Sequence, residues 1–397
     1  MSNYYRQIVE KLDELVKSRF IEMFGQIKAD TELNDLCTFI SRGKSAKYVE
    51  DSNVFIIGQA CIRTDKIEFD RVRCSITTTN TSEFRLKFGD VLVNSTGVGS
   101  LGRCYEFINP DERLYVTDSH VTILRLNLSS LRPTFIRCYL NQDNVQNEIY
   151  KKCVNGSTNQ IELNKNSFLH FKVPRAPIDK QIEFENFVKQ VDKSKVIALK
   201  AAEKYDQLVK SRFIEMFGDL QTQPIALNKV CTFINGDRGV NYPSKEDFVE
   251  SGIPFVNAGH LINGVIDFSE MNYITQDKYD KLGSGKIERG DILYCLRGSI
   301  GKQAISTITH AAIASSLVIL RPSKDILPEY LSYELGSVRA QKYLAQCKNG
   351  SSQPNLSADS LKKYSLRIPP LEQQQSFVEF VKQADKSKVT TEQECKQ

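Results

Sequence analysis

Few residues of this 397-residue chain have the type and spacing that catalysis requires. The four histidines stand alone, and the ten cysteines are scattered singly without a C-x-x-C pair. A zinc site needs clustered Cys and His ligands, so we predict free thiols and no metal site. The GSGK segment at 283–286 lacks the earlier glycine of a P-loop, and no serine-hydrolase, zinc-protease or dinucleotide-binding motif occurs. We therefore expect a chain that catalyses no reaction alone.

Loops that combine glycine with basic and amide side chains are better candidates for a site. The segments GDVLVNSTGVGSLGR (89–103) and GDILYCLRGSIGK (290–302) place such side chains between glycines after an apolar run. Loops of this kind can approach a phosphate backbone closely, and Arg, Lys and Asn can read base edges. An ordinary glycine-rich turn between two strands is the alternative interpretation. The formal net charge of +5 permits a nucleic-acid partner without requiring one.

An internal repeat indicates which elements position these loops. The segment LVKSRFIEMFG occurs twice, at 15–25 and at 208–218, and FVKQVDKSK from Phe187 is answered by FVKQADKSK from Phe380. The chain therefore contains two copies of one unit, and its ends divide one copy in the middle of its long helix, with the first half at 371–397 and the second half at 1–25. We expect the two chain ends to lie close together. A plain tandem duplication without this closure is the alternative.

The repeated segments have the pattern of long paired helices. Residues 178–217 contain no Pro or Gly, follow Pro177 and precede Gly218, which are helix start and stop signals. Apolar residues recur at alternating spacings of three and four, as in a coiled coil, and such a helix would be about 60 Å long. The predicted helix-pairing residues are Ile8, Leu12, Leu15, Phe187, Val191, Ala198, Ala201, Tyr205, Leu208, Phe380 and Ala384.

Two segments between these helices mix short strands with helices and contain the basic excess. We therefore predict an α+β fold with two pseudo-symmetric globular domains, joined by a pair of long antiparallel coiled-coil helices in a circular internal repeat. The predicted parts are the N-terminal half of the distal helix (1–28), the first globular domain (29–177), the central long helix (178–219), the second globular domain (220–370) and the C-terminal half of the distal helix (371–397).

Each globular copy ends in an NGS segment and a hydrophobic-proline run, followed by a glutamine near the start of the helix. These residues are Asn155, Gly156, Ser157, Val173, Pro174 and Gln181, then Asn349, Gly350, Ser351, Ile368, Pro369, Pro370 and Gln373. In their order, spacing and duplication the motifs resemble the specificity subunits of type I restriction-modification systems, over essentially the whole chain. The RGSIGK segment (297–302) also looks like that family's glycine loop. The first copy departs from the family in reading VPRAP and in a glycine loop longer by two residues.

The resemblance implies two target-recognition domains that each read one half of a bipartite DNA target, held apart by the helices. It also implies two methyltransferase (modification) subunits that dock on the helices and use S-adenosylmethionine, and restriction subunits that translocate and cut. This chain would then be a non-catalytic subunit without a cofactor of its own, bound to double-stranded DNA. The DNA-binding residues that we expect are Lys44, Arg71, Arg73, Asn94, Thr96, Arg103, Arg238, Tyr242, Lys245, Asn257, His260, Arg297, Ser299 and Lys302.

Two other interpretations remain open from the sequence. A self-contained restriction-methylation enzyme would need a catalytic motif, which we do not find. A coiled-coil scaffold, or a DNA-binding protein without a role in restriction-modification, is the second alternative. The sequence has no apolar run of about 18 residues and no apolar signal-peptide core at its start, so we expect a cytoplasmic protein without membrane contact.

Overall fold

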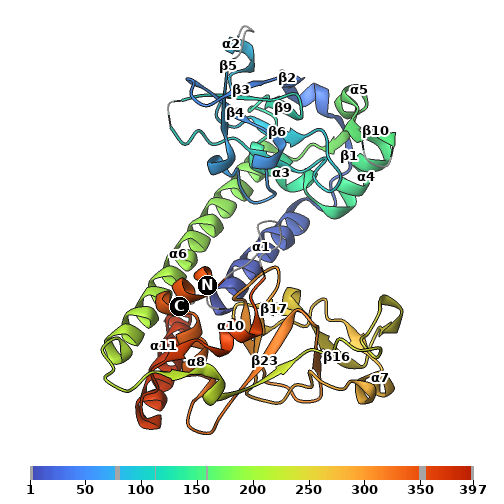
Figure 1. Ribbon diagram of the computed structural model, residues 1–397. Coiled ribbons are helices and arrows are strands. Elements are labelled where there is room, and N and C mark those ends of the chain that lie inside the picture. The colour runs from blue at the N-terminus through green and yellow to red at the C-terminus, as the bar shows by residue number, and fades with distance from the viewer. Residues whose placement is uncertain (1–2, 77–80, 112, 158–159, 348–354, 395–397) are drawn as a thin grey trace. The chain divides into compact units, whose positions relative to one another are not determined.

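The computed structural model describes the chain except residues 1–2, 77–80, 112, 158–159, 348–354 and 395–397 (Figure 1). The chain divides into two compact units. Residues 7–198 form one, here called the N-terminal unit, and residues 1–6 with 199–397 form the other, the C-terminal unit. The 40-residue helix α6 (Ile178–Phe217) contributes its first half to the N-terminal unit and its second half to the C-terminal unit.

The N-terminal unit contains two four-stranded sheets. The first sheet is antiparallel, with the order β2 (Cys37–Arg42), β9 (Val121–Leu126), β6 (Val91–Asn94) and β7 (Cys104–Glu106). The second has the order β3 (Lys47–Val49), β5 (Arg73–Ile76), β4 (Val54–Ile57) and β8 (Leu114–Thr117), and its β4–β8 pair is parallel. Strand β6 is central and buried throughout, which explains its continuous apolar run.

The remaining elements of the N-terminal unit surround these sheets. They are α1 (Asn3–Phe24, from residue 7 on), β1 (Ala29–Glu32) paired with β12 (Lys172–Pro174), α2 (Thr81–Phe84), α3 (Pro133–Leu140), α4 (Asp143–Cys153), the hairpin β10 (Val154–Ser157) and β11 (Gln160–Leu163), and α5 (Lys165–Leu169).

The C-terminal unit has two sheets with the same strand order. The first is antiparallel, with β14 (Cys231–Asn235), β23 (Leu317–Pro322), β20 (Ile292–Cys295) and β21 (Gln303–Ile305). The second has β15 (Phe248–Val249), β19 (Tyr273–Ile274), β16 (Ile253–Val256) and β22 (Ala312–Ile313), with β16 and β22 parallel. The repeat that is visible in the sequence therefore corresponds to a repeated strand topology.

Short strands and helices complete the C-terminal unit. They are β13 (Ile225–Ala226) paired with β24 (Ser365–Leu366), the hairpin β17 (Leu261–Ile262) and β18 (Val265–Ile266), α7 (Gln276–Lys281), α8 (Pro328–Leu335), α9 (Val338–Gln346), α10 (Ala358–Lys362) and α11 (Leu371–Glu394).

Aromatic side chains pack three helices of the N-terminal unit against one another. Phe24 of α1 lies 4.8 Å from Phe135 of α3 between ring centroids, and Phe184 of α6 lies 5.5 Å from Phe24. Further along the two helices, Lys195 Nζ lies 2.5 Å from Asp13 Oδ1. High-numbered residues of α6 therefore meet low-numbered residues of α1, so the two segments run in opposite directions.

The C-terminal unit has the corresponding cluster. Phe217 of α6 lies 5.0 Å from Tyr330 of α8, and Phe213 lies 5.3 Å from Phe377 of α11. Further along α6, Tyr205 forms a side-chain hydrogen bond with Asp385 of α11, so α6 and α11 also run in opposite directions. The repeated LVKSRFIEMF segment supplies Phe24 to the first cluster and Phe213 and Phe217 to the second.

Leu15 and Leu208 were predicted to pair helices, and this is wrong. Their exposed fractions are 47% and 51%, whereas Val209 is 2% exposed and Val16 packs against the core. A straight α-helix has 3.6 residues per turn and drifts from a 3.5-residue repeat by about 20° per heptad. The buried stripe of the helix therefore shifts by one residue, from Leu208 to Val209, and continues four residues later at Phe213. The other predicted helix-pairing residues are buried or half-buried.

The first residues of α1 belong to the C-terminal unit rather than to the N-terminal unit. Burial, and then the charge of Asp385, raises the pKa of Tyr5. This interaction joins the start of α1 to α11, the two segments that the internal repeat predicts to be the halves of one divided helix. The terminal residues 1–2 and 395–397 lie outside the described residues, and among the described helices none is long and apolar enough to cross a membrane.

Candidate nucleic-acid interface

A buried aspartate–arginine pair fixes the start of the central strand in each unit. Asp90, which is 2% exposed, accepts hydrogen bonds from Arg125 Nε at 3.0 Å and Nη2 at 2.8 Å. Asp291 is 1% exposed and accepts the same two bonds from Arg321, at 2.8 and 2.9 Å. Bidentate charge-assisted bonds hold one defined geometry. The repeated Gly-Asp motif thus positions the strand that leads into each glycine loop.

The glycine loop of the N-terminal unit (95–103) leaves the end of β6 and is held by side chains from two other loops. Thr96 Oγ1 donates to Gln59 Oε1 at 2.6 Å and lies 3.0 Å from His120 Nδ1. Gly97 and Gly99 have φ angles of 94° and 76°, in the left-handed region that favours glycine. These contacts give the loop a fixed shape at one edge of the first sheet.

Arg73 and Arg71, which were predicted to bind DNA, lie on β5 and at the end of the 3-10 helix before it. Arg73 on β5 lies 3.5 Å from the ring centroid of Tyr48, and the Tyr48 hydroxyl donates to Asp118 at 3.2 Å. Arg71 is exposed and pairs with Glu68 at 2.7 Å. Because Asp118 lies in the loop that also contains His120, Tyr48 and Arg73 border the segment that supports the glycine loop.

Lys44 and Arg103 add further positive charge to the same edge. The Lys44 backbone N–H donates to Thr117 O at 3.3 Å, and its exposed ammonium group lies 4.7 Å from the ring centroid of Phe84. Arg103 Nη2 donates to Gly99 O at 3.0 Å, within the glycine loop. The edge of the N-terminal unit therefore brings together basic residues from three separate segments.

In the C-terminal unit, the corresponding edge gathers Arg238 and Tyr242 around Ser315. Arg238 is exposed and donates to Ser315 O at 3.4 Å, while the Tyr242 hydroxyl accepts from Ser315 N at 3.4 Å. Arg297 is exposed just after β20, where its backbone bridges to Asn355. Arg238 follows β14 and Arg297 follows β20, so both lie on loops that leave the same edge of the sheet.

The other residues predicted in the C-terminal unit occupy three local settings. Ser299 and Lys302 are exposed in the glycine loop, where the Lys302 N–H donates to Ser299 O at 3.1 Å. Asn257 Oδ1 accepts from the Gly259 N–H at 2.8 Å and so closes a local turn. Lys245 is exposed on the one-turn 3-10 helix that precedes β15.

Asn94 and His260 were predicted to contact DNA, but both side chains are buried. Asn94 is 0% exposed and donates from Nδ2 to Gln59 O at 3.2 Å. His260 is 7% exposed; its Nδ1 accepts from the Asn257 N–H at 3.1 Å, and its Nε2 lies 3.1 Å from Glu270 O. Both side chains are enclosed and form hydrogen bonds within the fold. We therefore exclude both residues from the proposed DNA contacts. Polar residues beside glycine loops can support the loop rather than face its ligand.

Comparison with known proteins decides the family. Residues 222–397 match the family described as "Type I restriction modification DNA specificity domain". The putative type I restriction enzyme MjaX specificity subunit of Methanocaldococcus jannaschii is 22% identical over 91% of this chain and 88% of its own length. The second half of the chain thus matches the type I DNA specificity domain, and the chain as a whole is similar to a type I specificity subunit. This confirms the family that the sequence motifs resemble, and the protein is the DNA specificity component of a type I restriction-modification system.

Other relatives of this specificity subunit match it over shorter stretches. The MjaVIII specificity subunit of M. jannaschii is 22% identical over 60% of this chain and 61% of its own length. The HindI specificity subunit of Haemophilus influenzae is 27% identical over 38% of this chain and 34% of its own length. One chain of a solved type I restriction-modification structure has a TM-score of 0.51 at 16% identity and covers 91% of both chains, which shows a shared fold.

The sequence did not indicate two residues that support the loop edges, which are the sheet edges with the loops after β2 and β6 in one unit and after β14 and β20 in the other. Gln59 supports both Thr96 and Asn94, and Asp237 accepts from the Gly239 and Gly283 N–H groups at 2.6 and 2.7 Å. These two N–H groups hold the pKa of the Asp237 carboxyl below its ordinary value. Neither residue belongs to a motif, and only the fold brings it to its partners. Among the described residues, no group of three or more His, Cys, Asp or Glu side chains could hold a metal ion.

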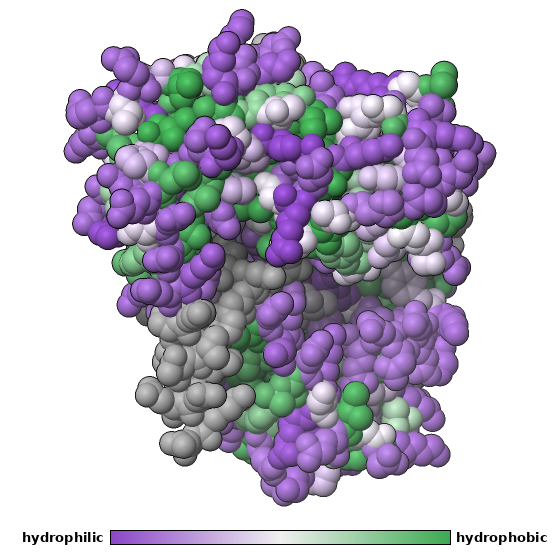
Figure 2. Space-filling model, turned by 90° about the horizontal axis from the view of Figure 1, so that it is seen from below, coloured by the Kyte–Doolittle hydropathy of each residue, from purple (hydrophilic) through white to green (hydrophobic). Residues whose placement is uncertain are grey.

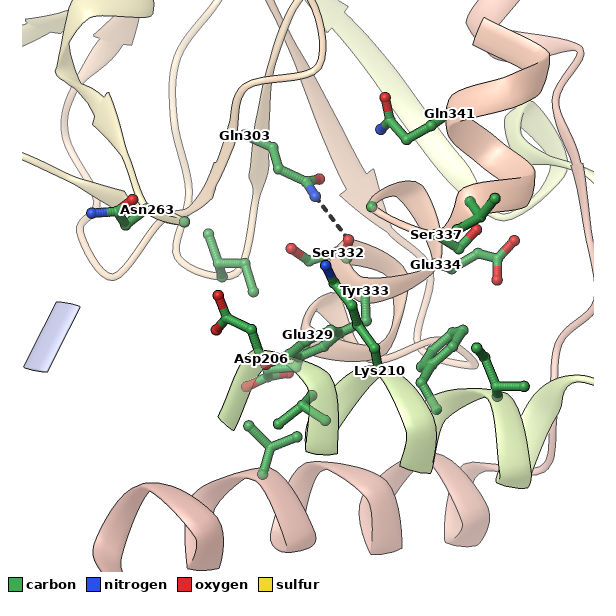
Figure 3. A pocket seen from close by; sticks show the side chains of 18 of the residues that line it. Asp206, Lys210, Asn263, Gln303, Glu329, Ser332, Tyr333, Glu334, Ser337 and Gln341 are labelled. Carbon is green, nitrogen blue, oxygen red and sulfur yellow. Dashed lines mark hydrogen bonds between the residues drawn. The ribbon is translucent and has the colours of Figure 1, made fainter. Parts of the chain in front are cut away.

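A groove of about 1460 Å³ lies beside α6 in the C-terminal unit. Asp206 and Lys210 of α6 line one side, Gln303 and Gln341 lie across from them, and Asn263 comes from the β17–β18 hairpin (Figure 3). Gln303 Nε2 donates to Ser332 O at 2.8 Å, while Gln303 Oε1 has no partner among the described residues. The groove walls thus combine apolar helix side chains with amide groups.

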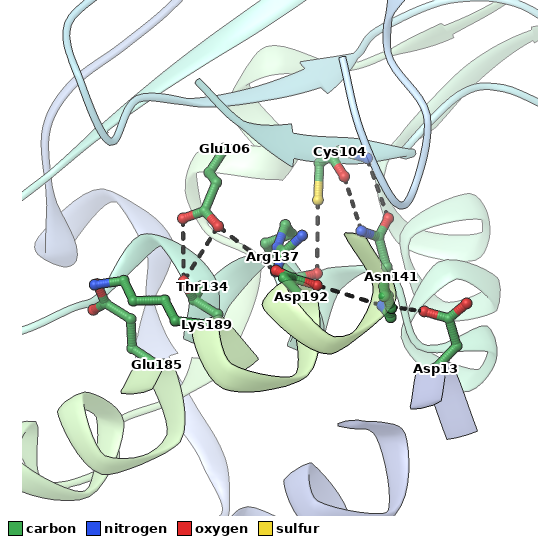
Figure 4. A network of polar contacts seen from close by, with 10 residues as sticks. Asp13, Cys104, Glu106, Thr134, Arg137, Asn141, Glu185, Lys189 and Asp192 are labelled. Carbon is green, nitrogen blue, oxygen red and sulfur yellow. Dashed lines mark hydrogen bonds and ion pairs between the residues drawn. The ribbon is translucent and has the colours of Figure 1, made fainter. Parts of the chain in front are cut away.

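The equivalent place in the N-terminal unit is filled by a polar network (Figure 4). Arg137 of α3, the counterpart of Ser332 on α8, is 7% exposed, and its Nη2 lies 3.6 Å from Glu106 Oε1. Thr134 Oγ1 donates to the same carboxylate at 3.1 Å, and the Arg137 guanidinium lies 4.5 Å from the ring centroid of Tyr105. Burial raises the pKa of Glu106. The long Arg137 side chain therefore stands where the groove of the C-terminal unit has the smaller Ser332.

Proposed function

We propose that each unit reads one half of a bipartite DNA target through the loop edge of its first sheet. This proposal rests on the observation that basic residues from distant segments of the chain meet at one sheet edge in each unit. Residues predicted from distant segments, such as Lys44 and Arg103 in one unit and Arg238 and Arg297 in the other, gather on loops at the same sheet edge of both units. Exposed Arg and Lys side chains are the usual donors to phosphates and to guanine edges.

The long helices would set the distance between the two half-sites. We infer that α6 pairs with α1 and α11 as an antiparallel coiled coil, since its contacts with each run in opposite directions. In this proposal residues 29–177 and 220–370 are pseudo-symmetric target-recognition domains. The helical residues 1–28, 178–219 and 371–397 then form the spacer, which closes the circular repeat.

We also propose that this subunit contributes recognition and its partners contribute chemistry. Two methyltransferase subunits would dock on the helices and bind S-adenosylmethionine, and restriction subunits would join the same complex. The MjaX, MjaVIII and HindI proteins named above are themselves specificity subunits of type I restriction enzymes, which supports this division of labour. A coiled-coil scaffold without a restriction-modification role is less well supported, because the family match covers the second recognition domain rather than the helices alone.

Two arginines at opposite ends of one strand test the proposed interface. Arg297 follows the end of β20 and Arg289 precedes its start, and both are exposed. We expect Arg297→Ala, in the complex with its methyltransferase subunits, to cost about 1–3 kcal/mol in DNA binding and to relax one base pair of one half-site. The control Arg289→Ala should leave the target unchanged. Equal effects of both variants, or no effect of Arg297→Ala at any site, would refute this placement of the DNA.

A further inference from the structure

Each of the two loop edges holds one valine that is largely exposed to solvent. Val98 is 69% exposed and Val240 is 100% exposed. Other exposed apolar side chains lie scattered among hydrophilic ones, as the face in Figure 2 shows. These two differ because Val98 lies in the glycine loop and Val240 lies two residues after Arg238, so both belong to the proposed DNA interface.

Each valine lies in a stretch that its own unit has and the other unit lacks. Backbone bridges at Thr96 and Arg297 align the glycine loops, and from this point the first loop has two more residues, Val98 and Gly99. The loop that follows β14 and contains Val240 is longer than its counterpart after β2. Segments that differ between two otherwise matching domains are the places where two different half-sites can be distinguished.

The backbone around Val98 is fixed, so its exposure is not a property of a loose loop. The Leu101 N–H donates to Gly97 O at 3.0 Å, and Leu101 itself is 2% exposed. An added Cβ at Gly99 would meet no atom within 4 Å. The glycine is therefore required by its left-handed φ rather than by close packing, and the turn that it makes holds Val98 out into solvent.

The backbone around Val240 is anchored on both sides. Asp237 accepts from the Gly239 N–H at 2.6 Å, and Asn241 Nδ2 donates to Lys281 O at 3.0 Å. The Tyr242 N–H donates to Gly239 O at 3.0 Å. Val240 therefore stands at the tip of a braced turn, where burial would require a surface that is absent from the free chain.

We propose that Val98 and Val240 are specificity-determining residues, each of which packs against the C5-methyl group of a thymine in the major groove of its own half-site. A thymine methyl is the apolar feature of the major groove, and small apolar side chains contact it. Basic neighbours support this partner, since Arg103 donates to Gly99 O beside Val98 and Arg238 precedes Val240. The inference rests on the proposed function, because it requires these edges to face DNA.

Replacing single thymines by deoxyuridine in the bound DNA tests the contact, because deoxyuridine lacks only the methyl group. The assay measures binding of the complex of this chain and its methyltransferase subunits to duplexes that carry the bipartite target. One thymine in each half-site should show about a fourfold loss of affinity on replacement, the value of one buried methyl. In Val98→Ala the sensitivity should disappear from one half-site only, and in Val240→Ala from the other half-site only.

A third exposed valine provides the control. Val338, at the start of α9, is 68% exposed and lies outside both loop edges, so Val338→Ala should keep both deoxyuridine effects. A half-site without any methyl-sensitive thymine, or valine variants that keep the wild-type pattern, would overturn the proposed contacts and leave the bipartite target intact. If the wild-type complex recognised no bipartite target at all, the proposed function itself would fail, and this inference would fail with it.

Discussion

A buried glutamine at the start of each long helix offers a sharp test of how the helices hold the recognition domains. Gln181 is 0% exposed; its Oε1 accepts from the Arg132 N–H at 2.8 Å, and its Nε2 donates to Ser130 O and Ala176 O at 3.1 and 2.8 Å. Gln374 makes the same three kinds of bond, to Leu327 N and to the carbonyls of residues 325 and 369. Each glutamine satisfies three backbone groups that flank a helix and a strand.

The expected loss in free energy of unfolding follows from the three backbone groups that a methionine at position 374 would leave without a hydrogen bond. Gln374→Met keeps a side chain of similar length but removes all three bonds, which strands one N–H and two carbonyl groups. An unsatisfied buried polar group costs about 1–3 kcal/mol, so we expect a loss of at least about 3 kcal/mol from the C-terminal unit. That is a large share of the 5–15 kcal/mol typical of a folded domain.

Hydrogen exchange measured by mass spectrometry resolves the two units separately. Gln374→Met should speed exchange in peptides from the C-terminal unit, and Gln181→Met should do so in the N-terminal unit. Gln375 is the next residue of α11 and is exposed, so Gln375→Met is the matched control and should change little. A Gln374→Met variant with the exchange rates of Gln375→Met, or with a loss below about 1 kcal/mol, would refute the reasoning.

Two further predictions concern residues that hold the loop edges in place. Asp90→Asn should destabilise the N-terminal unit by about 3 kcal/mol, because it leaves the largely buried Arg125 guanidinium without its charge partner; urea unfolding that matches wild type would contradict this. The pKa of Asp237 is lowered by the N–H groups of Gly239 and Gly283, so its stabilising effect is present above the unfolded value of about 3.9 and is lost only as the pH falls through the lower folded value. An NMR titration of the Asp237 carboxyl with a midpoint at or above that unfolded value would contradict the loop geometry.

The long helices and the repeat could be predicted from the sequence because both are encoded locally. Residues 178–217 lack helix breakers and carry a regular apolar spacing, and α6 occupies this range. The position of single residues on the helix surface was harder to predict. The heptad spacing predicted that Leu15 and Leu208 face the partner helix. In the structure, Val209 is buried and Val16 packs against the core instead.

The family glutamine shows the same limit. The motif predicts Gln373 as the counterpart of Gln181, but residues 373–375 are all glutamines, and only the structure shows which one is buried. Gln374 makes the three bonds, and Gln373 is exposed. The correct residue lies three positions before Phe377, as Gln181 lies three before Phe184.

The loop edges were predictable as regions but not residue by residue. Glycine loops with basic residues indicated these regions, and Arg297 and Lys302 are exposed there, while their contact with DNA stays a prediction. Asn94 and His260 have side chains of the right type, but their neighbours bury them. Val240 carries no polar signal, so its exposure could be learned only from the fold.

The most direct test of the account is modified-base sequencing of genomic DNA from a methylation-free host that expresses this chain with its methyltransferase subunit. We expect a split motif with N6-methyladenine in both halves, separated by a spacer of fixed length. Methylation of one continuous motif would contradict two recognition domains held apart by helices. No methylation, although the two proteins purify together, would contradict DNA reading by this subunit.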